Sequence, residues 1–190
     1  MTNTLQKNIG IVSLILAPLF IVISQFFWNN GVLTITAGVL QVFAYFFWIF
    51  AFQGMFQLVQ ESMPRYAVIG FFIAVLSCIG GNNFGVDGIY GDLMGVTNQA
   101  QMDEMHSKLG GAAVAYLFLP GLLFPLSLLI LGINLIRTQS VTLGIGLLLC
   151  IAAVGFPLSR VPRIDWIAHL DNFLLLISHV LVALQITQRK

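Results

Sequence analysis

Long uncharged, apolar intervals alternate with short polar segments along this chain. No charged residue lies between Lys7 and Glu61, or between Lys108 and Arg137. A transmembrane helix needs about 20 apolar residues to cross about 30 Å of hydrocarbon. Within lipid every backbone N–H and C=O must be satisfied internally, so such intervals form helices or a closed barrel. Barrel strands are short and alternate in polarity. Because these intervals are long and apolar on all faces, the pattern predicts an all-α integral membrane protein.

The intervals predict a bundle of six transmembrane helices that forms one domain over residues 1–190. The predicted helices span about 9–28, 32–60, 66–79, 110–136, 142–158 and 164–187. Between the third and fourth, the Gly- and Asp-rich segment 80–108 predicts a loop and a short interfacial helix capped by Asn98. The sequence Asn29-Asn30-Gly31 predicts a turn. Pro120 predicts a bend in the fourth helix.

Composition narrows the function classes. Of the 190 residues, 58% are hydrophobic and 8% are charged, and the mean hydropathy is +0.96. Soluble domains carry about 25% charged residues, so a soluble or a disordered chain is excluded. The net charge of +1 offers no basic surface for phosphates, and no nucleic-acid partner is expected. Cys78 and Cys150 stand alone in apolar runs, where cysteine is usually a small buried apolar side chain.

The basic residues predict an orientation. An even number of helices places both termini on one side of the membrane. Basic residues favour cytoplasmic loops, and the side with the termini has five of them against three on the other side. The five are Lys7, Arg65, Arg137, Arg189 and Lys190; the three are Lys108, Arg160 and Arg163. The sequence therefore predicts cytoplasmic termini in a plasma or inner membrane.

The last predicted helix has a polar stripe. At 100° per residue, Asp165, His169, Asn172 and His179 share one face. Polar groups inside a membrane face the bundle interior or a wet cavity. The stripe therefore predicts a polar cavity, lined by this helix and open to the outer face, that binds or transports a small solute. Histidines change charge near neutral pH, which suggests proton coupling. Alternatively, the stripe only joins helices through hydrogen bonds.

Other polar residues extend this candidate site. Asp171 points away from the stripe and needs a partner, for which Arg160 and Arg163 are candidates. The two arginines either bind an anionic head group or substrate or neutralise the acidic segment 87–108. Gln41 and Tyr45 share a face of the second helix and are predicted to line a pocket, because a lipid-exposed amide is costly.

Three polar residues of the segment 80–108, Asp87, Asp92 and His106, are predicted to lie over the site at the outer face. With Asp165 and His169 they offer ligands of the types that bind metals. No pair of them has a diagnostic spacing, so we expect no metal and no cofactor.

Three functional hypotheses follow. The leading one, a membrane protein that binds or transports a small solute, is not an enzyme. The second is a membrane-embedded enzyme that acts on a lipid or quinone with Asp165 and His169 as acid and base. The third is an accessory membrane subunit with no site of its own. The expected partners are membrane lipids, a small-molecule ligand, and a second copy of the chain or a partner subunit.

Overall fold

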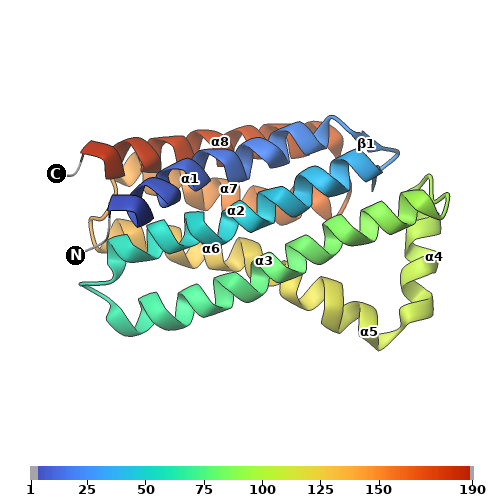
Figure 1. The fold of residues 1–190 in the computed structure, drawn as a ribbon, viewed down its shortest axis with the longest axis horizontal. Coiled ribbons are helices and arrows are strands. Elements are labelled where there is room, and N and C mark those ends of the chain that lie inside the picture. The colour runs from blue at the N-terminus through green and yellow to red at the C-terminus, as the bar shows by residue number, and fades with distance from the viewer. Residues whose placement is uncertain (1–3, 189–190) are drawn as a thin grey trace.

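The computed structural model describes residues 4–188 and is almost entirely helical (Figure 1). Six helical runs in it are long and apolar enough to cross a membrane, which supports the prediction of an all-α integral membrane protein. The runs are α1 (Thr4–Gln25), α2 (Ile35–Val59), α3 (Pro64–Leu93), α5 (Gly111–Ala113) with the π-helix η1 (Val114–Phe118) and α6 (Leu119–Arg137), α7 (Leu143–Arg160) and α8 (Asp165–Gln188).

The six runs form a closed ring in chain order. Each packs against the next, and α8 packs back against α1. The two ends of the described chain lie at one end of the bundle, as Figure 1 shows. At the other end lie a hairpin, of β1 (Trp28–Asn29) and β2 (Val32–Leu33), and the short helix α4 (Gln99–Leu109). We call this second end the hairpin end.

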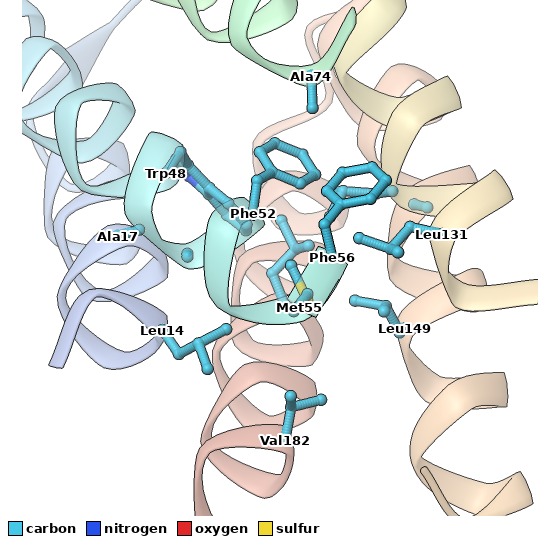
Figure 2. Close-up of a cluster of buried hydrophobic side chains, with 14 of the residues drawn as sticks. Leu14, Ala17, Trp48, Phe52, Met55, Phe56, Ala74, Leu131, Leu149 and Val182 are labelled. Atoms are coloured by element: carbon cyan, nitrogen blue, oxygen red, sulfur yellow. The ribbon is translucent and has the colours of Figure 1, made fainter. Parts of the chain in front are cut away.

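Large side chains of α2 fill the middle of the ring (Figure 2). The Trp48 ring lies edge-on to the Phe124 ring, with ring centres 4.9 Å apart. The centre of the Phe52 ring lies 5.8 Å from the centre of the Phe124 ring. Met55 and Phe56 of α2 are labelled beside them. The remaining labelled residues come from each of the surrounding helices: Leu14 and Ala17 of α1, Ala74 of α3, Leu131 of α6, Leu149 of α7 and Val182 of α8. The outward-facing side chains are also apolar, as expected where helices meet lipid.

The Gly-rich segment is helix rather than loop. The sequence predicted that the third helix ends near Ile79, whereas α3 continues to Leu93. A side chain at Gly81 would overlap the Tyr45 ring, and one at Gly85 would lie 2.9 Å from the Gly38 carbonyl oxygen. Glycine weakens helices in water, but small residues let membrane helices approach closely. Gly81 and Gly85 let α3 approach α2, and Gly80 lets it approach α6. The predicted loop was therefore wrong for residues 80–93.

The short helix after this segment agrees with its predicted cap. The Asn98 side-chain oxygen accepts a hydrogen bond from the Gln101 backbone N–H at 3.1 Å. The helix that it starts, α4, connects α3 to α5 across the hairpin end (Figure 1).

Pro120 explains the π-helical turn η1. Proline has no backbone N–H, so the carbonyl four residues earlier, on Tyr116, loses its helical donor. The Asn83 side-chain amide donates to that carbonyl at 2.9 Å instead. The irregular turn gives α6 its change of course, near the place where the sequence predicted a bend.

The hairpin arises from the predicted turn. Asn30 and Gly31 have φ of +49° and +80°, the left-handed pair that tight two-residue hairpins require. Trp28 pairs with Leu33 across the strands. Trp28 therefore belongs to the hairpin rather than to the first helix, and its ring lies beside the connection between α7 and α8.

Candidate functional site

A cavity of about 370 Å³ lies at the hairpin end of the bundle. Its walls come from α2, α3, η1, α6 and α7, and α1 contributes Ile21. The hairpin and α4 lie at its border. Most of the wall is apolar, and five aromatic residues contribute to it: Trp28, Tyr45, Phe84, Phe118 and Phe156. The polar lining residues are Gln41, Gln99, Asp103, Arg160 and Arg163. The cavity therefore combines an aromatic wall with two arginines and one carboxylate, that of Asp103.

Arg160, the last residue of α7, is held from two sides. Its Nη2 donates to the Asn172 side-chain oxygen at 2.6 Å, and its Nη1 lies 3.6 Å from an Asp171 carboxylate oxygen. The guanidinium carbon lies 4.2 Å from the centre of the Phe156 ring, within the range of a cation–π contact. These contacts fix the guanidinium at the cavity wall.

Asp171 supplies the counter-charge for Arg160. Its side chain is 2% exposed, and Gly155 makes room for it, since a Cβ there would overlap the carboxylate. Neither carboxylate oxygen accepts a hydrogen bond from residues 4–188. Arg160 is thus the partner that the sequence required, and Asp171 depends on it.

Arg163 lies in the connection between α7 and α8 with φ of +55°. Its guanidinium carbon is 5.2 Å from the centre of the Trp28 ring. Within the described part of the chain, its side chain has no hydrogen bond and no ion pair. Burial lowers the pKa of the Arg163 guanidinium, while the charges of Asp103 and Asp87 act in the opposite direction. An arginine nevertheless stays protonated at pH 7.

Four of the residues predicted from sequence line the cavity: Gln41, Tyr45, Arg160 and Arg163. The Gln41 amide donates to the Gly81 carbonyl oxygen at 3.1 Å, which satisfies this polar group beside the cavity. The helix α2 thus places its polar side chains toward the interior.

The predicted lining by the last helix was wrong for this cavity. No described residue of α8 is among those that line it. Asn172 reaches the cavity only through its hydrogen bond with Arg160. His179 is buried in packed core, with Nδ1 2.7 Å from the Leu175 carbonyl oxygen and its ring 4.6 Å from Trp48. The helical periodicity correctly placed Asn172 and His179 on the inward face of α8. The interior beside them is packed with side chains of other helices and is not a cavity.

Asp165 and His169 do not meet at the cavity either. Asp165 is exposed at the start of α8. The His169 ring packs against Phe26 of the segment after α1, with ring centres 4.7 Å apart. The residues of the polar stripe therefore have different surroundings. Asp165 is exposed, His169 packs against Phe26, and His179 lies in the core.

Asp87, Asp92 and His106 connect elements at the hairpin end by polar contacts. His106 Nε2 lies 2.7 Å from an Asp87 carboxylate oxygen and joins α4 to α3. An Asp92 carboxylate oxygen accepts a hydrogen bond from the Ile35 backbone N–H at 2.7 Å, a favourable place for a negative charge at a helix start. In place of the predicted loop, α4 borders the cavity with Gln99 and Asp103. No group of three His, Cys, Asp or Glu among the described residues could hold a metal ion.

The aromatic wall was not predicted from the sequence. Trp28, Phe84, Phe118 and Phe156 were not distinguished from lipid-facing aromatic residues. One signal was present: Phe156 and Arg160 are four residues apart on a helix, the spacing at which side chains contact each other. An aromatic ring and a cation at that spacing indicate a fixed guanidinium.

A second hollow, of about 630 Å³, lies at the opposite end of the bundle. It is bordered by Lys7 and by exposed polar residues of the connection between α2 and α3, such as Gln60 and Glu61. It has none of the aromatic residues that surround the two arginines at the hairpin end. We therefore regard the cavity at the hairpin end as the candidate site.

Comparison of the chain with protein families, curated proteins and solved structures finds no match.

Proposed function

We propose that this integral membrane protein binds a small amphipathic molecule in the cavity at the hairpin end. The observation that supports the proposal is an aromatic wall beside two arginines in one cavity of about 370 Å³. Ligand pockets are commonly about 300–1,000 Å³, mostly apolar, with a few convergent polar groups. An apolar portion would pack against Phe84, Phe118 and Phe156, and a polar portion would reach the arginines.

The proposal is confined to binding. The enzyme hypothesis needed Asp165 and His169 as acid and base, and neither lines the cavity. The proton-coupling hypothesis needed His169 or His179 on the path, and His179 is surrounded by core side chains. Among residues 4–188, no contact of Asp165, His169 or His179 supports the enzyme hypothesis or the proton-coupling hypothesis.

Photo-crosslinking tests the proposal. Two probes, decanol and decanoate with a diazirine in the alkyl chain, are added to the protein in nanodiscs, and the labelled peptides are identified by mass spectrometry. We expect at least one probe to label cavity residues such as Phe118 more than lipid-facing residues such as Phe43. Leu122→Trp fills the cavity, because Leu122 lines it and is 54% exposed. This variant should lose the excess labelling.

Leu126→Trp is the matched control. Leu126 lies one turn further along α6, is 50% exposed, and is not a cavity residue. Its variant should label like the wild type. Equal labelling of cavity and lipid-facing residues, unchanged by Leu122→Trp, would contradict the proposal.

We also propose that both termini face the cytoplasm and that the hairpin end lies at the outer membrane face. The two ends of the described chain lie together (Figure 1), and basic residues favour the cytoplasmic side. A C-terminal green fluorescent protein fusion should fluoresce in bacteria, and a C-terminal alkaline phosphatase fusion should be inactive. An active phosphatase with a dark fluorescent protein would show the opposite orientation.

A further inference from the structure

We propose that the cavity holds its amphiphile through one anionic group, a carboxylate or phosphate, bound by Arg163 with Arg160 as the neighbouring donor. This inference rests on the proposed function and names the class of ligand.

The two arginines differ in what they already contact. Arg160 uses both terminal nitrogens toward the protein, with Nη2 on Asn172 and Nη1 on Ser159 and near Asp171. Its charge is compensated by a buried carboxylate. Arg160 therefore contributes a fixed guanidinium to the cavity wall, and its terminal nitrogens are already engaged by the protein.

Arg163 is half-buried at the cavity, and the protein does not engage its terminal nitrogens in the same way. A guanidinium has five N–H donors in one plane and no acceptor. With the Trp28 ring 5.2 Å from the guanidinium carbon, the stacking contact does not satisfy the N–H groups. Within residues 4–188 no side-chain or backbone oxygen accepts from them. Arg163 lines the cavity, so a group there can reach the donors.

The acids near Arg163 have other contacts. An Asp103 oxygen accepts a hydrogen bond from the Gln99 side-chain amide at 2.6 Å. Asp87 is paired with His106. Both influence Arg163 through their charge, yet neither lies within ion-pair distance of it. One cation of the cavity therefore lacks a contacting anion, which fits a ligand with a single anionic group.

The aromatic wall adds the second requirement. A hydrated inorganic anion gains nothing from Phe84, Phe118 and Phe156, whereas an alkyl chain does. Charge-assisted hydrogen bonds to carboxylate or phosphate also strengthen where water is excluded. The combination favours an amphiphile, which could be a free fatty-acid-like molecule or a phospholipid whose head group enters the cavity.

The test compares the decanoate and decanol probes on Arg163→Gln, on Arg163→Lys, and on Arg137→Gln as the matched control. Arg137 is exposed at the opposite end of α6. Labelling of cavity residues is normalised to labelling of lipid-facing Phe43, which removes differences in partitioning. In the wild type and in Arg137→Gln we expect decanoate to exceed decanol by about tenfold or more, the effect of one hydrogen bond to a charged group.

Arg163→Gln should abolish the preference for decanoate, and Arg163→Lys should retain part of it, because lysine keeps the charge without the planar fork. Thermal unfolding of each variant checks that it is folded. Equal labelling by decanol and decanoate in the wild type would overturn the anion while leaving the amphiphile site standing. A preference that survives in folded Arg163→Gln would overturn the assignment to Arg163.

Competition identifies the source of the anion. Displacement of the decanoate probe by phosphatidylglycerol in the nanodisc, but not in matched phosphatidylcholine nanodiscs, would support a lipid head group. Displacement by free decanoate alone would support a fatty-acid-like ligand. Displacement by inorganic phosphate at the same concentration as free decanoate would overturn the amphiphile in favour of a soluble anion.

Discussion

Replacing Arg160 with methionine should lower the free energy of unfolding by about 3–5 kcal/mol, the usual cost of removing one partner of a buried ion pair. The loss follows because Asp171 is 2% exposed and has no hydrogen bond from the described residues. Without Arg160 this side chain must either keep an uncompensated charge in a low-dielectric site or take up a proton, and both cost free energy. Unfolding in mixed detergent micelles, followed by circular dichroism, measures the difference.

Two further variants separate the charge from the packing of Arg160. The double variant Arg160→Met/Asp171→Asn removes both charges and should recover most of the lost stability. Asp171→Asn alone should cost less than Arg160→Met, because Arg160 is at the cavity wall with 17% of its side chain exposed. If the double variant is no more stable than Arg160→Met, the loss is not caused by an unpaired Asp171.

The second large effect is expected in the core. Phe52→Ala should destabilise the protein by about 3 kcal/mol, because Phe52 is fully buried and contacts the rings of Trp48, Phe56 and Phe124. Between membrane helices the cost comes from lost packing contacts and the remaining cavity, since lipid is as apolar as the core. The same unfolding assay measures it.

Phe46→Ala is the matched control on the same helix. Phe46 is 53% exposed, and lipid chains can occupy the space that its ring leaves. Its variant should remain within about 0.5 kcal/mol of the wild type, as for most surface substitutions. If Phe52→Ala and Phe46→Ala lower the free energy of unfolding by comparable amounts, the interior of the helical bundle is not the tightly packed region.

The six spans were predictable because their signal is length and apolarity, which the backbone requirement in lipid turns into helices. The Asn98 cap and the Asn30-Gly31 turn were predictable because each depends on local chemistry. The course of α3 was not, since its glycines look like loop residues until their partners are known. Tyr45 and the Gly38 backbone lie so close to Gly81 and Gly85 that no larger residue fits at these helical positions. This reason for the glycines is visible only in the folded structure.

The candidate site was predicted in part. The requirement that Asp171 have a cationic partner led to Arg160 and Arg163 as candidates, because a buried carboxylate without one is costly. In the structure the partner is Arg160. A helical wheel places Asn172 and His179 inward, but it cannot distinguish a wet interior from a packed one. That distinction depends on Trp48, which arrives from α2 and covers His179. The aromatic wall likewise forms from five separate segments, so no single stretch of sequence indicates it.

We propose above all that the cavity at the hairpin end holds a ligand. Native mass spectrometry of the purified protein, released from detergent, tests this most directly when the wild type is compared with Leu122→Trp and Leu126→Trp. We predict an additional mass, of an amphiphile with an acidic group, on the wild type and on Leu126→Trp, and its loss from Leu122→Trp. The same adducts on all three proteins would contradict the assignment of this cavity as the binding site.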